Sequence, residues 1–348
     1  MGMHENKIST VNKNHNPANA TTPHVVTMID AINMALHRAM ESDPNVVVLG
    51  EDVATNGGVF RATVGLKERF GHKRVMDTPL AETLIAGISV GMAAQQLRPV
   101  AEIQFMGFIY ATMEHIVSHA ARLRNRTRGR LSCPMVLRAP YGGGIHAPEH
   151  HSESTEALFA HIPGIRVVIP SSPTRAYGLL LSAIEDPDPV IFLEPKRIYR
   201  MVKQEIYDDG IGLPLDTCYT LRQGEHITLI SWGAMVHETL QAADLLQEQG
   251  ISAEVIDVAT ISPLDIDTLV ASVQKTRRCV IIQEAAKHCG VAAEICTSIQ
   301  EQAFAELKAP IARVTGFDTP MPYLRRENIY MNSPQDIVTA ALTTLEAL

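Results

Sequence analysis

The 348-residue chain has the composition of an ordinary globular protein, with 46% hydrophobic and 20% charged residues and a formal net charge of −8. Its length is enough for two domains, and its negative charge argues against a nucleic-acid-binding protein. The five scattered cysteines include no CxxC pair, which argues against a disulfide framework or a zinc ribbon and favours a reducing cytoplasm. No apolar run approaches the roughly 18–20 residues of a membrane-spanning helix.

Residues 1–23 are polar and rich in asparagine. We expect a disordered tail, because such a segment cannot bury enough apolar surface to fold. It has neither the apolar centre of a signal peptide nor the arginine-rich pattern of a mitochondrial presequence. The first folded domain is therefore predicted to begin at residue 24.

Strand-like and helix-like segments alternate through residues 24–203. Continuous apolar runs predict strands buried on both faces, and the segments between them have helical patterns. This alternation predicts a parallel sheet covered by helices on both faces. The predicted strands are 46–50, 99–105, 134–139, 166–170 and 189–194, and the predicted helices are 27–41, 82–96, 110–124 and 174–185.

The pattern lapses over 204–220, where Asp, Gly and Pro without a clear period predict a linker. A second α/β domain is predicted over 221–348. Its strands are expected at 228–232, 253–258 and 279–283, and its helices at 236–249, 264–273 and 291–307.

Two glutamates occupy positions suited to a ligand site. Glu51 directly follows the strand 46–50, and ligands bind at the carboxyl ends of parallel strands; taken alone, it is better explained as an acidic loop residue. Glu82 begins the helix 82–96, where any carboxylate is favoured by the helix dipole. Because that helix is apolar or small on every side, we expect it to be buried and Glu82 to be desolvated, which suits a carboxyl group to proton transfer.

A segment rich in glycine and histidine follows the strand 134–139. Its three consecutive glycines, 142–144, predict a flexible loop, and His146, His150 and His151 crowd into the residues after them. Histidines in a loop at the carboxyl end of a strand indicate a functional site.

These segments together resemble the β subunits of pyruvate and branched-chain 2-oxo acid dehydrogenases. The motifs occur in the family's order: GEDV, GGVFRAT, DTPLAE, AEIQFMGF and PEHHSE. The second half, with ISWGAMVHETL, EVIDVATISPLD and VIIQEA, looks like the transketolase carboxyl-terminal domain. The resemblance covers residue 23 to the end, and it implies a pyrimidine-binding domain with a parallel sheet followed by a transketolase-like α/β domain.

The resemblance implies half of a thiamine diphosphate site. An α subunit would hold the diphosphate through magnesium, and this chain, which has no Gly-Asp-Gly motif and no P-loop, would hold the aminopyrimidine ring. Glu82 matches the glutamate that hydrogen-bonds a ring nitrogen. Glu51 matches a second acid that shares a proton path with this glutamate. Gln104 and Phe108 match positions beside the ring, although a strand amide and a core phenylalanine explain them as well. His151 matches the histidine that stabilises charge during acyl transfer.

The family can also bind a structural potassium ion. The matching positions are Met135, Ala183, Ile184, Asp186 and Asp188. Asp188 departs from the usual asparagine of the family, and an Asp-Pro-Asp-Pro turn is the simpler explanation of the last two.

The resemblance implies oxidative decarboxylation of a 2-oxo acid in an α2β2 heterotetramer. The acyl group would pass to lipoyl-lysine of a dihydrolipoyl acyltransferase core, on which the carboxyl-terminal domain would dock. The IHAPEHHSE segment favours pyruvate, and branched-chain 2-oxo acids and acetoin remain alternatives.

Three other kinds of protein compete with this interpretation. The sequence GISVG at 87–91 fits the GxSxG motif of serine hydrolases, but its Ser89 falls inside a helix-like run. The loop histidines could bind zinc, although their spacing matches no standard motif. The run RLRNRTRGR, from Arg122 to Arg130, could bind nucleic acid, but a helix end facing solvent or a partner subunit explains it better.

Overall fold

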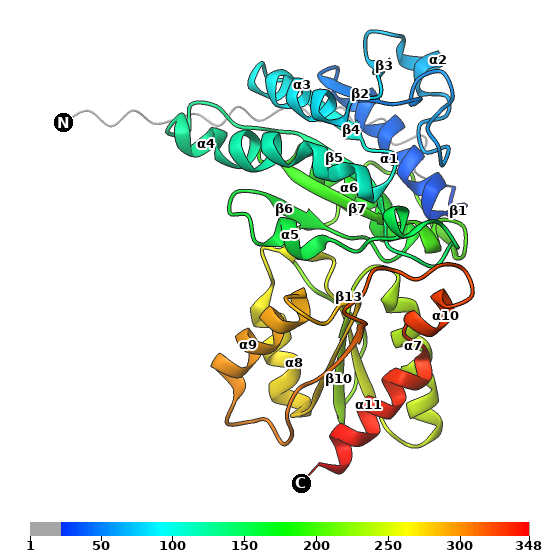
Figure 1. The fold of residues 1–348 in the computed structure, drawn as a ribbon, viewed down its shortest axis with the longest axis vertical. Coiled ribbons are helices and arrows are strands. Elements are labelled where there is room, and N and C mark those ends of the chain that lie inside the picture. The colour runs from blue at the N-terminus through cyan, green and yellow to red at the C-terminus, as the bar shows by residue number, and fades with distance from the viewer. Residues whose placement is uncertain (1–21, 348) are drawn as a thin grey trace, which may run out of the picture.

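The computed structural model describes residues 22–347, and nearly all of the tail predicted over 1–23 lies outside them. Two α/β domains lie one above the other in Figure 1, each built around one sheet. Within the described residues, no helix is both long and apolar enough to cross a membrane.

The upper domain in Figure 1 contains a seven-stranded sheet in the order β12-β6-β7-β5-β4-β2-β3. Only the edge strand β12 runs antiparallel to its neighbour. The predicted parallel sheet is therefore confirmed. Its strands are β2 (Val46–Gly50), β3 (Val75–Asp77), β4 (Arg98–Glu102), β5 (Val136–Tyr141), β6 (Arg166–Val168), β7 (Val190–Pro195) and β12 (Thr260–Ser262).

Helices cover both faces of this sheet, which explains why its central strands β2, β5 and β7 are buried throughout. Helices α1 (Met28–Ser42) and α6 (Pro173–Glu185) pack together, and α3 (Glu82–Ala94) lies on the other face. Thr27 precedes α1 and forms a capping box with Asp30, and Ser172 caps α6, so both helices are preceded by residues that satisfy free backbone N–H groups. Smaller elements are β1 (His24–Thr27), which pairs antiparallel with β8 (Lys203–Ile206), and the helices α2 (Leu66–Phe70) and α5 (Glu156–Ala160).

The prediction of one α-helix over 110–124 is wrong in its details. It is a succession of short turns: η2 (Met106–Thr112) and η4 (Ala120–Arg122) are 3₁₀-helices, η3 (Glu114–His119) is a π-helix, and α4 (Leu123–Arg126) is a short α-helix. The hydroxyl of Thr112 donates to the Ile109 carbonyl at 2.6 Å, which favours the tighter turn there.

The composition of helix α3 predicted burial on every side, but the helix is buried on one side only. Its residues Ile85, Ala86, Ser89 and Ala93 are buried, whereas Leu84 is 43% exposed. The physical reason is that an apolar helix surface can be covered by another chain, and sequence alone does not say which chain covers it. One apolar side of α3 is left uncovered by the described residues.

The lower domain contains a five-stranded sheet in the order β14-β13-β10-β11-β9, with the edge strand β9 antiparallel. Helices α7 and α11 pack together on one face, and α8 and α9 on the other. The strands are β9 (Tyr219–Arg222), β10 (Ile227–Ser231), β11 (Ala253–Asp257), β13 (Cys279–Ala286) and β14 (Ala312–Gly316). The helices are α7 (Met235–Glu248), α8 (Ile266–Thr276), α9 (Val291–Ala303), α10 (Glu327–Tyr330) and α11 (Pro334–Glu346).

The two domains share structure. Strand β12 follows β11 of the lower domain in the chain but pairs with β6 of the upper sheet, and one buried apolar cluster includes residues of both domains. The segment predicted as a linker, 204–220, includes most of β8 at its start and the first residues of β9 at its end. The domains are therefore packed together rather than tethered.

Candidate active site

The carboxyl ends of the upper domain's parallel strands bring the predicted site residues to one edge of the sheet. Glu51 follows β2, Gln104 follows β4, and His151 lies in the 3₁₀-helix η5 (Glu149–His151) after β5. Glu82 begins α3, which follows β3. Because parallel strands all end at the same edge, residues distant in sequence meet there.

Glu51 and Glu82 lie close enough for their charges to interact. Glu51 is only 7% exposed, and among the described residues its Oε1 atom has no hydrogen-bond partner. Burial raises the pKa of Glu51, and the negative charges of Glu82 and Asp52 raise this pKa further. The side chain of Gln104 donates to the Glu51 carbonyl at 3.5 Å and to Asp52 Oδ2 at 3.3 Å, so Gln104 belongs to the same cluster.

The structure makes Glu51 the more buried of the two acids, since Glu51 is 7% exposed whereas Glu82, expected to be desolvated, is half-buried. The residues after Glu82 in α3, Thr83 and Leu84, are exposed. Glu51, at the end of a strand buried on both faces, is the acid that folding removes from water.

His151 lies in an aromatic cluster. Its ring stacks on Phe105, with centroids 4.0 Å apart and planes at 15°, and meets the edge of Phe108 at 5.4 Å. Burial lowers the pKa of His151, and the charges of His150 and Lys196 lower this pKa further. His151 is therefore a neutral imidazole at neutral pH, able to donate one hydrogen bond and accept another.

Sequence reasoning missed two residues that place His151. Phe105, its stacking partner, lies in the quoted motif AEIQFMGF but had no sign of its own. A Cβ atom added at Gly107 would overlap the backbone oxygen of His150. Gly107 therefore lets the η5 turn approach η2. In the sequence, a glycine between the apolar residues Met106 and Phe108 was the feature that could have indicated this close approach.

The three glycines at 142–144, predicted to form a flexible loop, pack closely against other segments. A Cβ atom at Gly142 would lie 2.6 Å from Glu284 Oε1, and one at Gly144 would overlap the side chain of Arg197. Gly144 also has φ of +85°, which side-chain-bearing residues rarely adopt. The glycines are needed because this loop packs closely against other parts of the protein.

Lys196 is a further residue that sequence reasoning missed. It follows β7 in the 3₁₀-helix η6 (Lys196–Ile198), is 4% exposed, and among the described residues its Nζ atom has no hydrogen-bond partner. Burial lowers the pKa of Lys196 to about 8, although the carboxylates of Glu284 and Glu327 act to raise it. Its charge in turn influences His151, so it lies within the electrostatic reach of the site.

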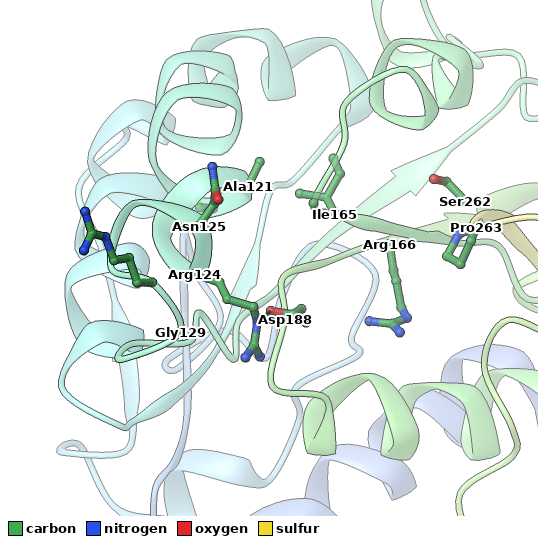
Figure 2. A pocket seen from close by; sticks show the side chains of 12 residues that line it. Ala121, Arg124, Asn125, Gly129, Ile165, Arg166, Asp188, Ser262 and Pro263 are labelled. Atoms are coloured by element: carbon green, nitrogen blue, oxygen red, sulfur yellow. Dashed lines mark hydrogen bonds and ion pairs between the residues drawn. The ribbon is translucent and has the colours of Figure 1, made fainter.

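The positions predicted for potassium lie away from this edge, at the amino ends of β5 and β7. Met135 precedes β5, Asp186 and Asp188 precede β7, and Ala183 and Ile184 lie at the end of α6. A cavity of about 700 Å³ lies beside these positions. Figure 2 shows Arg124, Arg166 and Asp188 among the residues that line it.

Guanidinium groups already occupy acceptors that a potassium ion would need. The Ile184 carbonyl accepts from Arg98 at 2.8 Å, and Asp186 Oδ1 accepts from Arg166 at 3.1 Å. Over residues 22–347, no cluster of three or more His, Cys, Asp or Glu side chains is arranged to hold a metal ion. Arg98 and Arg166 therefore compete with an ion for two of the five predicted ligands, and the potassium site stays a prediction.

The competing interpretations are not supported. Ser89 is fully buried inside α3, and its hydroxyl donates to the Ile85 carbonyl at 2.7 Å, which does not match an exposed nucleophile on a sharp turn. His146 pairs with Glu327 rather than joining a metal cluster. The arginines from Arg122 to Arg130 are exposed at a helix end, and Arg124 pairs with Asp188.

Comparisons with known proteins agree with this fold. Residues 24–202 match the transketolase pyrimidine-binding domain, and residues 216–337 match the transketolase C-terminal domain. A split-gene transketolase, described as an inactive beta4 tetramer, is similar with a TM-score of 0.75 and 21% identity over 92% of this chain and 99% of that one. A mutant transketolase from Pichia stipitis has a TM-score of 0.67 and 15% identity over 95% of this chain and 48% of its own. The fold and the matched domains define a chain of the transketolase type with two domains.

Curated relatives identify the family within this class of transketolase-type chains. The pyruvate dehydrogenase E1 component subunit beta of Acholeplasma laidlawii is 50% identical over 90% of this chain and 96% of the relative. The subunit of the same name from Bacillus subtilis is 48% identical over 92% of this chain and 99% of the relative. This chain belongs to the family of pyruvate dehydrogenase E1 component beta subunits.

Proposed function

We propose that this chain is the β subunit of a thiamine-diphosphate-dependent pyruvate dehydrogenase and contributes half of an active site that an α subunit completes. One observation carries the proposal: Glu51 and Glu82 interact at the carboxyl edge of the parallel sheet, in a chain about half identical to pyruvate dehydrogenase subunits. Pyruvate is preferred over branched-chain 2-oxo acids and acetoin because the similar relatives are named for it.

The residues at this edge fit the aminopyrimidine ring of the cofactor. The partnerless Glu51 Oε1 is a buried acceptor or donor that needs a polar group, and Gln104 and Phe108 provide polar and aromatic neighbours for a ring. Thiamine diphosphate, when bound, supplies the electron sink for decarboxylation. The chain's sequence has no recognised phosphate-binding motif, so an α subunit would hold the diphosphate and magnesium.

Each acid then has a separate task. Glu82, half-buried at the start of α3, would exchange a hydrogen bond and a proton with a pyrimidine nitrogen. Glu51 keeps its own proton to a higher pH than an exposed glutamate does, because burial and two neighbouring carboxylates disfavour its charge. It can therefore supply or store the proton that Glu82 transfers.

His151 would act in the second half of the reaction. As a neutral imidazole held against Phe105, it can donate a hydrogen bond to the negative charge that develops when the acetyl group passes to a lipoyl group. We expect His151→Ala to impair this acyl transfer more than decarboxylation.

Partner chains are part of the proposal. The uncovered apolar side of α3, including Leu84, is available for another subunit, and an α2β2 heterotetramer in the cytoplasm is the arrangement that we expect. The acyl acceptor would be lipoyl-lysine of a dihydrolipoyl acyltransferase core. The potassium site stays a prediction, in which Arg98 and Arg166 compete for two of the five ligands.

Calorimetry with thiamine diphosphate and magnesium tests the shared site. The titration is made on this chain alone and on this chain co-purified with its α subunit. Binding only in the co-purified sample supports the proposal. In that sample, Glu82→Gln should weaken the binding of thiamine diphosphate. Tight binding to the chain alone would mean that it holds the phosphates itself, which contradicts the half-site.

A further inference from the structure

Two buried glutamates of the lower domain reach the histidine-bearing loop of the upper domain. Glu284 lies on β13 and is 5% exposed, and Glu327 begins α10 and is 1% exposed. Both carboxylates face the segment 142–154, which runs from the end of β5 through η5 and carries His151. A buried carboxylate is costly unless its oxygens are hydrogen-bonded, so these contacts matter for both domains.

The carboxylate of Glu327 accepts hydrogen bonds from the first part of this segment. Its Oε1 atom accepts from the Gly144 backbone N–H at 2.5 Å, and its Oε2 atom accepts from the His146 backbone N–H at 2.9 Å. The His146 ring nitrogen Nδ1 also lies 2.5 Å from Oε2. Both oxygens therefore fix backbone donors, and such charge-assisted bonds are among the stronger ones in proteins.

The carboxylate of Glu284 ties the two ends of the segment together. Its Oε1 atom accepts from the Gly143 backbone N–H at 2.6 Å and from the Ser154 hydroxyl at 3.0 Å. The Gly142 N–H donates to the Glu153 carbonyl at 2.9 Å, which closes the same loop within the upper domain. His151 thus projects from a loop that is held at its base by the other domain.

The glycines at 142–144 permit this approach. An added Cβ atom at Gly142 would crowd Glu284, and one at Gly143 would overlap Met321 of the lower domain. The loop is therefore shaped to receive side chains from the lower domain, which a merely flexible linker would not require.

Charge also couples the two glutamates to the site. The buried ammonium group of Lys196 is influenced by Glu284 and Glu327 on one side, and it influences His151 on the other. Next to it, Arg197 makes a bidentate ion pair with Glu238 of α7, at 2.5 and 2.9 Å. The lower domain therefore contacts the residues after β7 as well as the segment 142–154.

We propose that Glu284 and Glu327 are positioning residues for acyl transfer, which hold the segment 142–154 from the lower domain and so keep His151 stacked on Phe105. The inference rests on the role proposed for His151. It gives the carboxyl-terminal domain a part in the chemistry of a site that the amino-terminal domain carries.

The test uses Glu327→Gln in the complex with the α subunit. A glutamine has one acceptor oxygen, and its amide group would meet the N–H of Gly144 or His146, so one donor loses its partner. Acetylation of a free lipoyl domain should fall about tenfold or more, whereas pyruvate decarboxylation with an artificial electron acceptor should change by less than about twofold. Glu284→Gln is the second variant, in case Glu327→Gln fails to assemble.

Glu254→Gln is the matched control. Glu254 is also buried in the lower domain, where it accepts from Ser272 and pairs with Lys275 on the far side from the loop. It should lose stability to a similar degree and keep normal acyl transfer. An equal loss of acyl transfer in this control would overturn a specific role for Glu327.

Hydrogen exchange separates this inference from the proposed function. The backbone N–H groups of Gly143, Gly144 and His146 should exchange faster in Glu327→Gln and Glu284→Gln, and at the wild-type rate in Glu254→Gln. Normal exchange and normal acyl transfer in both loop variants would overturn the inference. Normal acyl transfer in His151→Ala would instead overturn the proposed role of His151, whatever the exchange rates are.

Discussion

At the scale of single residues, the chemistry of the site depends on how far each titratable group is exposed to solvent. Glu51 and Glu82 have the same side chain but different environments, since Glu51 directly follows a fully buried strand and Glu82 begins a helix. The same principle makes His151 neutral and depresses the pKa of Lys196. Environment, rather than residue type, therefore assigns the roles.

Glu82→Gln removes the carboxyl group that we expect to exchange a proton with the cofactor ring. Decarboxylation of pyruvate by the reconstituted complex should fall by about 10²–10⁴-fold, which is the range for loss of a general acid–base group. Steady-state assay with an artificial electron acceptor measures it, and thermal unfolding of the chain should be unchanged within about 2 °C because Glu82 is half-buried. Near-normal turnover would contradict the assignment.

Gly107→Ala tests the packing that places His151. The new methyl group would overlap the His150 backbone oxygen and push η5 away from η2. Acyl transfer should fall about tenfold or more because catalysis tolerates little misplacement. Gly91→Ala is the control on the isolated chain: its added Cβ meets nothing within 4 Å, so it should stabilise α3 by about 0.5–1 kcal/mol.

At the scale of elements, three neighbouring strands are joined by a buried ion network. Arg138 of β5 donates to Glu194 of β7 at 2.7 and 3.1 Å and to Glu102 of β4 at 2.9 Å, and the hydroxyl of Tyr199 donates to Glu194 at 2.5 Å. Burial raises the pKa of Glu102, and the charge of Arg138 opposes this rise. The network therefore depends on Arg138.

Arg138→Met should lower the free energy of unfolding by about 3–5 kcal/mol, because it leaves two buried carboxylates without their cation. Urea unfolding followed by circular dichroism measures the change. Arg124→Met removes the partner of Asp188 in a partly exposed pair and should cost less than about 1 kcal/mol. Equal effects of the two variants would show that burial does not set the energy of the network.

Asp257 at the end of β11 should make stability depend on pH. It is fully buried, accepts from the Ser171 hydroxyl at 2.6 Å, and burial raises its pKa to about 6. A raised carboxyl pKa stabilises the fold most below the unfolded value near 4, and this contribution is lost as pH rises through about 6. The difference corresponds to roughly 3 kcal/mol. Asp257→Asn should therefore gain stability relative to the wild type between pH 4 and pH 7, and parallel stability curves would contradict this.

At the scale of the whole molecule, the two domains should unfold together. Strand β12 completes the upper sheet from the lower chain segment, and the indole of Trp232 donates to Glu156 of the upper domain at 3.2 Å. Because Trp232 is the only tryptophan, its fluorescence reports on this interface. Urea transitions followed by fluorescence and by far-ultraviolet circular dichroism should coincide. An earlier fluorescence transition would mean that the domains separate before they unfold.

The sequence by itself determined the parallel sheet, five of its strands and the candidates Glu51, Glu82, Gln104, Phe108 and His151, but not the edge strands β3 and β12. Strands such as β2 are predictable because burial on both faces leaves a continuous apolar run. The segment 106–126 was not predictable in detail, because the choice among 3₁₀, π and α turns depends on packing rather than on local pattern.

Only the tertiary structure decided how those candidates are held. Phe105, Lys196, Glu284 and Glu327 have no local signature, because their importance comes from hydrogen bonds, stacking and buried charge between segments that are distant in the sequence. Composition likewise made α3 look wholly buried, although this chain covers only one side of it. A pattern in sequence records that a surface is apolar or that a group can titrate, and the fold alone determines what covers the surface and which charge the group faces.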